Sequence, residues 1–178
     1  MLQKCSVLKI AEVFFNEPTK AHYLIEISKK SKIAHTSVKK HLLTLKKQSI
    51  ITEYSEKKGK RDFPIYKANI EDKEYRFYKK IHNQIQLKRT GLVDFLKDKL
   101  MPSTIILFGS YARGEDVEDS DVDIFVTCKK EDIDLAEFEK ILNRKIQLHF
   151  KQEFKDYPKE LKNNIINGIV LEGYLEAV

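Results

Sequence analysis

Two short segments of the sequence carry residue types that could act on a phosphate group. Gly109 and Ser110 follow the apolar run 104–108, and Asp121 and Asp123 stand at the start of a second apolar run. Residues two apart in a β-strand share a face, so the two aspartates are expected to project together, while the apolar residues that alternate with them from position 122 to 126 project into the core. Each segment alone is common in loops and turns, whereas the two together are far more specific.

The residue types in these segments suit a phosphate beside a metal ion. Two converging carboxylates repel each other unless a cation lies between them, and Mg²⁺ with oxygen ligands is the usual remedy. Gly109 lets the backbone approach a ligand closely, and Ser110 at the start of a helix offers a hydroxyl and free N–H groups to an anion. The sequence therefore predicts a phosphate site next to a divalent cation.

The full pattern is a buried strand, Gly-Ser, ten residues and an Asp-x-Asp strand. It resembles the minimal nucleotidyltransferases of the DNA polymerase beta superfamily. The resemblance covers residues 92–178 and includes the closing stretch 167–173. It implies that Gly109 and Ser110 bind the β- and γ-phosphates of an NTP, which we expect to be ATP.

The same resemblance assigns the metal to the Asp-x-Asp pair. Asp121 and Asp123 would be the catalytic carboxylates and would bind one or two Mg²⁺ that grip the triphosphate. Arg113 is expected to assist in nucleotide binding, although a structural ion pair with Glu115 or Asp119 fits the sequence equally well.

The family also uses a third carboxylate on a neighbouring strand, and the matching stretch here is 145–149. Gln147 stands where that acid is expected. An amide can offer a neutral oxygen to a metal but cannot act as a base, so we expect nucleotide binding with catalysis impaired. His149 shares a face with Gln147 and could serve as a base or a ligand; an ordinary surface histidine is the alternative we favour.

The first 70 residues show a different pattern. Helices are expected over 2–15, 23–30 and 35–48, followed by strands at 50–54 and 63–67 around the basic turn 57–61. Val38, Leu42 and Leu45 form the expected buried stripe of the third helix, which Thr36 or His35 would cap. This order resembles winged helix-turn-helix regulators, as in archaeal proteins that fuse such a domain to a nucleotidyltransferase.

The charge distribution agrees with a nucleic-acid partner for this first part. The net charge of +6 divides into +9 over residues 1–70, +3 over 71–100 and −6 over 101–178. We predict that the start of the third helix faces base edges of double-stranded DNA while the turn contacts phosphates. The predicted DNA-binding residues are Thr36, Ser37, Lys39, Lys40, Lys58, Lys60 and Arg61. Lysine-rich helices are often only solvated surface, but here element order and charge agree.

The fold class expected is α+β. A winged helix-turn-helix domain would occupy residues 1–70, a helical linker 71–100, and a minimal nucleotidyltransferase α/β domain with a mixed sheet 101–178. The C-terminal domain would contain strands at 104–108, 122–127 and 145–150 and helices at 134–142 and 157–172.

Several smaller expectations follow from isolated residues. Cys5 and Cys128 lack CxxC or Cys/His spacing and are expected to be buried thiols. His22, His35, His41 and His82 are interpreted as ordinary surface or helix residues, and the aromatic residues of 75–78 as an interface between the linker helix and the domains. With no apolar run long enough to span a membrane, we expect a cytoplasmic protein without a membrane partner, acting as a homodimer.

Two functions fit these observations. One is a DNA-binding transcriptional regulator whose C-terminal domain binds an NTP with Mg²⁺ without turning it over. The alternative is an active nucleotidyltransferase that transfers NMP from an NTP to a hydroxyl of a protein or another acceptor. A HEPN-domain protein partner, which some minimal nucleotidyltransferases have, is a lesser alternative because those proteins generally lack a fused winged helix.

Overall fold

The computed structural model describes residues 5–150, 154–155 and 157–174. The chain forms two compact units, residues 1–79 (unit 1) and 80–178 (unit 2). The boundary falls inside one helix, α4 (Lys73–Thr90), rather than in an irregular linker.

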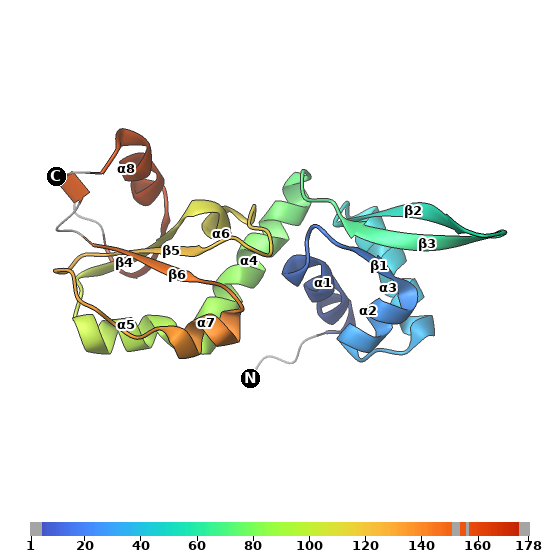
Figure 1. Cartoon of the computed structure of the whole chain (residues 1–178), viewed down its shortest axis with the longest axis horizontal. Helices are drawn as coiled ribbons and strands as arrows, with labels where there is room; N and C mark the ends of the chain where they lie inside the picture. Colours follow the sequence, from blue (N-terminus) through green and yellow to red (C-terminus); the bar gives the residue numbers. More distant parts are fainter. Residues whose placement is uncertain (1–4, 151–153, 156, 175–178) are drawn as a thin grey trace. The chain divides into compact units, whose positions relative to one another are not determined.

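Unit 1 combines three helices with a small antiparallel sheet (Figure 1). The helices are α1 (Ser6–Asn16), α2 (Leu24–Ser31) and α3 (His35–Lys47), and the strands are β1 (Ala21–Tyr23), β2 (Ile51–Lys58) and β3 (Arg61–Ala68). The sheet order is β1-β3-β2, so the long β2–β3 hairpin is completed by a third strand. Strand β1 is only three residues long, and no local pattern predicted it.

The core of unit 1 lies between its three helices and the base of the hairpin. Val38, Leu42 and Leu45 of α3 are buried as predicted, and they pack in one cluster with residues of α1 such as Phe14. Helix α4 is joined to this core by Tyr75, whose hydroxyl donates a hydrogen bond to the Phe14 carbonyl at 3.1 Å. Of the aromatic residues at 75–78, this one is therefore part of the core.

Unit 2 is built on a four-stranded mixed sheet with the order β6-β5-β4-β7, which confirms the predicted mixed sheet. Its elements are α5 (Leu92–Leu100), β4 (Thr104–Phe108), α6 (Gly109–Arg113), β5 (Val122–Val126), α7 (Ala136–Leu142), β6 (Ile146–Phe150), α8 (Lys159–Ile166) and β7 (Ile169–Gly173). Only the β5–β6 pair is parallel. The strands predicted at 104–108, 122–127 and 145–150 are all present.

Helices cover both faces of this sheet (Figure 1). Helices α5 and α7 lie on one face, where Val122, Ile124 and Val126 point into the larger core, as predicted for the apolar positions of β5. Helix α8 covers the other face through Ile165, which packs with Phe108 and Phe125. Successive apolar side chains along β5 therefore point to opposite faces of the sheet and enter two different cores.

The prediction of one helix over 157–172 is wrong in its second half. Helix α8 ends at Ile166, and Ile169–Gly173 forms strand β7 beside β4. The segment holds two consecutive β-branched residues, Ile169 and Val170, which favour a strand. Pairing with β4 also satisfies backbone groups that would otherwise be buried without partners.

Four predictions about single residues are corrected by the structure. Cys5 is exposed, because it stands just before α1, and Cys128 is half-buried. His22, in strand β1, is buried rather than on the surface or in a helix, whereas His82 is a helix residue of α4, as interpreted, although it is buried. Helix α3 begins after Ala34, with no side-chain cap from the neighbouring hydroxyl or imidazole.

Among the helices that the structure describes, none combines the length and apolar character needed to cross a bilayer.

Candidate functional site

The Gly-Ser segment and the second aspartate of the Asp-x-Asp pair meet at the end of β4. Strands β4 and β5 pair so that Phe108 lies opposite Asp123. Gly109 follows with a φ of +76°, and a Cβ added there would collide with the Asp123 carboxylate, lying 3.1 Å from its Cγ. The carboxylate occupies the space of the missing side chain, so any other residue at position 109 would be strained by the positive φ and would require Asp123 to shift.

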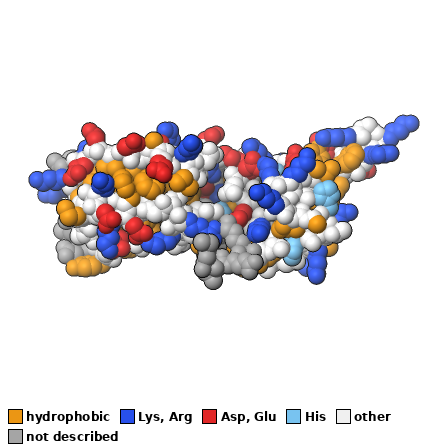
Figure 2. Space-filling view, turned by 90° about the horizontal axis from the view of Figure 1, so that it is seen from below, with side chains coloured by type: hydrophobic (Ala, Val, Ile, Leu, Met, Phe, Trp, Pro, Cys, Tyr) orange, Lys and Arg blue, Asp and Glu red, His pale blue; other side chains and the backbone are white. Residues whose placement is uncertain are grey.

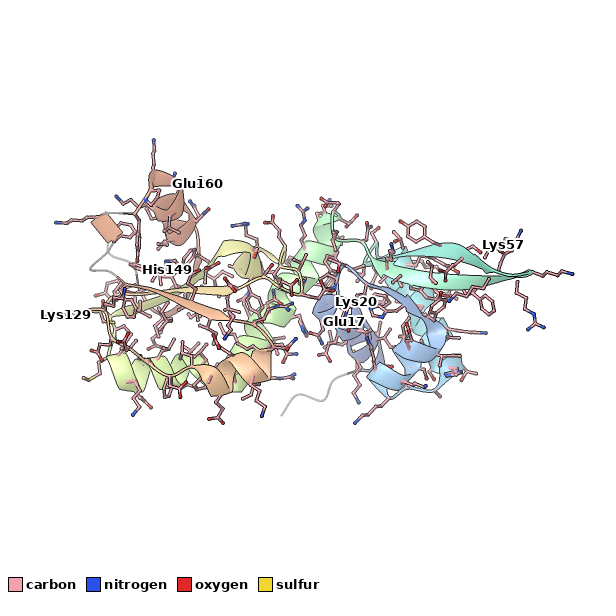
Figure 3. All side chains as sticks on the ribbon, viewed as in Figure 1. Glu17, Lys20, Lys57, Lys129, His149 and Glu160 are labelled. Carbon is pink, nitrogen blue, oxygen red and sulfur yellow. The ribbon has the colours of Figure 1, made fainter. Side chains whose placement is uncertain are left out.

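His149 lies beside the same aspartate, on the face of the sheet covered by α8 (Figure 3). Its Nε2 atom is 3.5 Å from Asp123 Oδ1. The imidazole ring packs edge-on against Phe108 at 5.0 Å and Tyr157 at 5.9 Å between ring centroids. Only 13% of the His149 side chain is exposed, and its buried Nε2 has no hydrogen-bond partner among the described residues. The interpretation of His149 as a surface residue is wrong.

Gln147 also neighbours Asp123, two residues before His149 on β6. The parallel register of β5 and β6 pairs Asp123 with Gln147 directly. The glutamine is exposed, whereas Ile146 and Leu148 on either side pack against the larger core. Asp123 is thus bordered by an exposed amide in one position of β6 and by a half-buried imidazole two residues further on.

Arg113 and Ser110 belong to the short helix α6, which begins at Gly109. The Arg113 Nε donates a hydrogen bond to Glu115 Oε2 at 2.7 Å, with about half of the arginine side chain exposed. The structural ion pair that the sequence left open is therefore formed. Ser110 is half-buried next to the Gly109–Asp123 contact.

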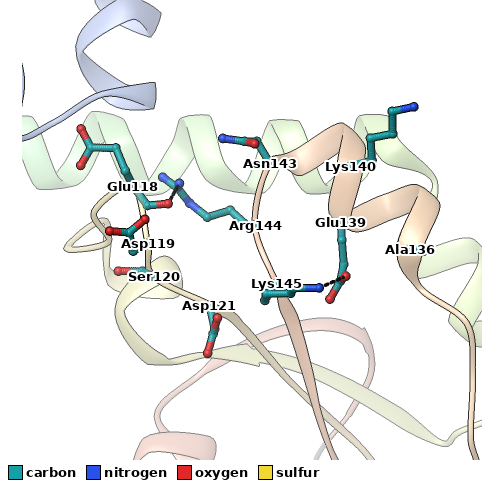
Figure 4. A pocket seen from close by; sticks show the side chains of 10 residues that line it. All are labelled: Glu118, Asp119, Ser120, Asp121, Ala136, Glu139, Lys140, Asn143, Arg144 and Lys145. Atoms are coloured by element: carbon teal, nitrogen blue, oxygen red, sulfur yellow. Dashed lines mark hydrogen bonds and ion pairs between the residues drawn. The ribbon is translucent and has the colours of Figure 1, made fainter.

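Asp121 stands one residue before β5, at the edge of an open cavity of about 540 Å³ (Figure 4). The cavity is lined by Glu118, Asp119, Ser120, Asp121, Ala136, Glu139, Lys140, Asn143, Arg144 and Lys145. Its lysine at the start of β6, Lys145, turns toward Glu139 and binds it at 2.9 Å. Glu139 also accepts a hydrogen bond from the Ile146 N–H, which, with Lys145, lowers the pKa of this carboxyl.

The loop between α6 and β5 is held by a buried polar cluster that sequence analysis missed. Asp116 is 2% exposed and accepts a hydrogen bond from Asn83 Nδ2 at 2.7 Å. Arg144 Nη2 lies 3.5 Å from the second Asp116 oxygen, and the same guanidinium donates to the Glu118 carbonyl. Because these partners are 26 to 33 residues apart, no local pattern could have predicted them.

The described residues offer a metal ion a small set of donors. No three His, Cys, Asp or Glu side chains within the described part of the chain gather closely enough to hold an ion by themselves. Asp123 and His149 do form a carboxylate–imidazole pair, in which Nε2 lacks a hydrogen-bond partner. These two donors fit an ion that takes its remaining ligands from water or a bound phosphate.

A second candidate surface lies on unit 1. The predicted residues of α3, which are Thr36, Ser37, Lys39 and Lys40, are all exposed, as are Lys58, Lys60 and Arg61 at the end of the β2–β3 hairpin. Figure 2 shows Lys and Arg side chains gathered at the tip of this hairpin. Lys58 packs its ammonium over the Tyr23 ring at 4.3 Å and also lies 3.5 Å from Glu56.

Part of unit 2 is similar to a known protein family. Residues 89–171 match the profile of the family described as nucleotidyltransferase domain. A relative from Methanocaldococcus jannaschii, named as a candidate protein adenylyltransferase, is 46% identical over 65 residues. That match covers 32% of this chain and 65% of the relative, so it spans slightly less than two thirds of the relative's length.

A solved structure described as a possible transcriptional regulator from Methanosarcina mazei Go1 is also similar in part. It shares 21% identity over 55% of this chain and 79% of that chain, with a TM-score of 0.38. A likeness at this level says nothing about function. The finding that bears on the site is the family match, which covers the Gly-Ser segment, both aspartates and Gln147.

Proposed function

We propose that the C-terminal unit binds an NTP together with a divalent cation, and that the N-terminal unit binds double-stranded DNA, so that the chain acts as a nucleotide-responsive transcription regulator. The observation that carries the nucleotide proposal is the packing of Asp123 onto Gly109 within a region that matches the nucleotidyltransferase family. A carboxylate held at the start of a Gly-Ser turn can hold a cation where backbone N–H groups can meet phosphate oxygens.

Each site residue has a role in this proposal. Gly109 keeps the turn open for Asp123, and Ser110 offers its hydroxyl and backbone N–H to phosphate oxygens. Asp121 and Asp123 would hold the ion, and two carboxylates alone would favour Mg²⁺. When bound, such an ion neutralises charge on the triphosphate. Arg113, already paired with Glu115, would contribute only after that ion pair opens.

The identity of residue 147, a glutamine, determines whether we expect efficient nucleotidyl transfer. Its amide lies next to Asp123 in the strand register, where the family resemblance places an acid. An amide cannot take a proton from an attacking hydroxyl, so binding without efficient transfer is the proposed behaviour. The chain would then sense nucleotide rather than consume it.

A second candidate function is favoured by the Methanocaldococcus jannaschii relative, whose name describes a protein adenylyltransferase. In that reaction a protein hydroxyl attacks the α-phosphorus of ATP, the bond to the β-phosphate oxygen breaks, and pyrophosphate leaves. The hydroxyl proton needs a base, and His149, 3.5 Å from Asp123, is a titratable side chain at the site that could accept it.

DNA binding is proposed for unit 1 because exposed cations occupy two neighbouring parts of it. Helix α3 exposes Lys39 and Lys40 near its start, and the β2–β3 hairpin exposes Lys60 and Arg61 at its end. A helix start that reads bases beside a basic hairpin that contacts phosphates matches the docking geometry of winged helix-turn-helix proteins.

One experiment separates the two functions of unit 2. The full chain is titrated with ATP and GTP in Mg²⁺ and in EDTA by calorimetry, and is then incubated with α-labelled ATP with and without cell extract. Binding that requires the cation, without label on any protein, supports the nucleotide sensor. Rapid label transfer establishes the transferase instead. NTP binding of equal affinity in EDTA removes the metal site from both proposals.

A further inference from the structure

The structure places a nitrogen ligand at the proposed ion site, on a residue that the family resemblance does not assign. His149 Nε2 is buried, has no hydrogen-bond partner among the described residues, and faces Asp123 Oδ1 at 3.5 Å. That separation exceeds the roughly 2.7–3.2 Å of a hydrogen bond, so the two atoms form no hydrogen bond, although they lie within ion-pair distance if the imidazole is protonated. A buried polar atom left in this way is unfavourable unless something else binds it.

The imidazole is held in its orientation by rings on both sides. Phe108 belongs to the buried core beneath α8, and its ring packs against His149 at 5.0 Å. Tyr157 packs at 5.9 Å and is itself fixed, because its hydroxyl bonds with the N–H and carbonyl of Phe150 at 3.1 and 3.3 Å. Aromatic neighbours cannot satisfy Nε2, but they keep it directed at Asp123.

The opposing carboxylate lies in the space that glycine leaves open. Asp123 extends from β5 into the space beside Gly109, where an added Cβ would contact it. Its side chain is 23% exposed, so solvent and ligands reach it while one oxygen faces the imidazole. The pair therefore presents one oxygen and one nitrogen donor at the edge of the proposed phosphate site.

We propose that His149 Nε2 and Asp123 Oδ1 bind the same divalent cation, and that the site consequently prefers an ion such as Zn²⁺ to Mg²⁺. Imidazole suits Zn²⁺, Fe²⁺ and Ni²⁺, whereas Mg²⁺ and Mn²⁺ are usually bound by oxygen ligands. The proposal deepens the proposed function and rests on it in one respect, since the ion that it identifies is the one that would hold the NTP.

In this arrangement His149 takes over a ligand position that Gln147 does not fill. The glutamine side chain is exposed and neutral, and it faces Asp123 only through the strand register. For an ion bound between Asp123 and His149, the imidazole nitrogen replaces the third carboxylate as a ligand. The site would then still bind a cation, but with a different ion preference.

The test uses the full chain and Mn²⁺ as the probe, alone and with a non-hydrolysable ATP analogue. Pulsed electron paramagnetic resonance of bound Mn²⁺ should detect coupling to an imidazole nitrogen, and Zn²⁺ should bind at least about tenfold more tightly than Mg²⁺. His149→Phe keeps a packed ring without nitrogen. It should abolish the coupling and weaken Zn²⁺ binding by about tenfold or more, while changing Mg²⁺ affinity little.

Two controls complete the design. Gln147→Ala changes an exposed neighbour of Asp123 and should leave the nitrogen coupling intact, and His35→Phe removes an exposed histidine of unit 1 with the same expected result. The proposal is overturned if wild-type protein gives no nitrogen coupling, if Zn²⁺ binds no better than Mg²⁺, or if either control abolishes the coupling. Nitrogen coupling without NTP binding would refute the proposed function alone, and NTP binding without nitrogen coupling would refute this inference alone.

Discussion

The Asp123 carboxylate occupies the space that a side chain at position 109 would need, so the glycine and the aspartate form one packed unit. This relationship links a backbone requirement to a candidate ligand. Gly109 has a φ of +76°, which disfavours other residues, and the contact adds a steric barrier to the conformational one.

The first prediction separates these two effects. Gly109→Ala should destabilise unit 2 and weaken NTP binding, because the new methyl group must displace Asp123. Gly91→Ala is the matched control, since Gly91 has a φ of +75° but nothing within 4 Å of an added Cβ. The control should lose about 1–2 kcal/mol of stability, from the left-handed backbone alone, and retain NTP binding. Urea unfolding measures the stability and calorimetry measures NTP binding. Equal effects of the two substitutions would show that the contact between position 109 and Asp123 is unimportant.

The second prediction concerns the buried pair of Asp116 and Arg144. Their side chains are 1% and 7% exposed, so Asp116→Ala leaves a buried guanidinium without its carboxylate and should cost about 3–5 kcal/mol. Glu115→Ala removes the exposed partner of Arg113 and should cost less than about 1 kcal/mol. Hydrogen exchange of peptides from β4 and β5 reports the difference. Similar protection in both variants would mean that the cluster does not hold the loop.

The third prediction restores the acid that the family resemblance calls for. Gln147→Asp places a carboxylate beside Asp123 in the strand register, and general-base catalysis is worth about 10²–10⁴-fold in rate. Transfer from α-labelled ATP should therefore rise by about 10²-fold or more, whereas Gln147→Asn, which keeps an amide, should change nothing. Brisk transfer by the wild type, lost in His149→Phe, would mean that the histidine already serves as the base.

The fourth prediction is a pH dependence of unit 1 stability. His22 is 2% exposed, and burial together with the charge of Lys30 lowers its pKa below the usual 6.5, against the opposite effect of Glu17 and Glu26. The unfolded chain therefore binds a proton at a higher pH than the folded one. Stability from this residue is complete above pH 6.5 and is lost as the pH falls below that value.

Thermal unfolding at a series of pH values checks this effect. The melting temperature of the wild-type protein should fall between about pH 7 and 5, and His22→Phe should flatten that part of the plot of melting temperature against pH. His35→Gln, on the exposed start of α3, should keep the wild-type profile. A profile that His22→Phe leaves unchanged would assign the acid sensitivity to other groups.

The fifth prediction concerns salt-dependent DNA binding by the full chain. Neutralising a phosphate contributes a slope of about −0.9 in log K against log salt, so removing the three cations at the hairpin end should flatten the slope by up to roughly 3. The variant is Lys58→Ala, Lys60→Ala and Arg61→Ala. A triple substitution of Lys129, Lys155 and Lys159 removes the same charge from unit 2 and should leave the slope unchanged.

Helix α3 should behave differently from the hairpin. Thr36→Ala with Lys39→Ala should relax the preference among DNA sequences more than it changes the salt slope, because base-edge contacts carry specificity. Fluorescence anisotropy with the DNA upstream of the protein's own reading frame and a scrambled fragment measures both effects. Binding that does not respond to salt would leave the basic surface without a role in DNA recognition.

Local patterns in the sequence predicted most of the elements and part of the site. The alternation of β5 predicted that Val122 and Ile124 enter the core, and the apolar run before Gly109 predicted a buried strand; both are observed. These signals are local, because strand periodicity and turn residues act within a few positions. The same local patterns predicted a helix that continues past the observed end of α8, because the pairing of β4 with β7 is a contact between distant segments.

The environment of individual polar residues could not be predicted in the same way. His149 alternates with core residues along β6 and was expected to face solvent, but α8 and Tyr157 cover that face of the sheet. Asp116 is buried because Asn83 and Arg144, both far away in the sequence, converge on it. Whether a polar side chain is buried depends on which distant elements pack over it, and that information is absent from any short window of sequence.

The position of Asp123 in the middle of the sheet has a thermodynamic consequence. It borders β4 on one side and β6 on the other, so its surroundings exist only when three strands are paired. A ligand bound there is lost whenever this part of the sheet unfolds, and its binding free energy is added to the stability of unit 2 as a whole. At a concentration of 100 times its dissociation constant, a nucleotide would add about 2.7 kcal/mol, enough to make occupancy visible as slower hydrogen exchange in strands that never touch it.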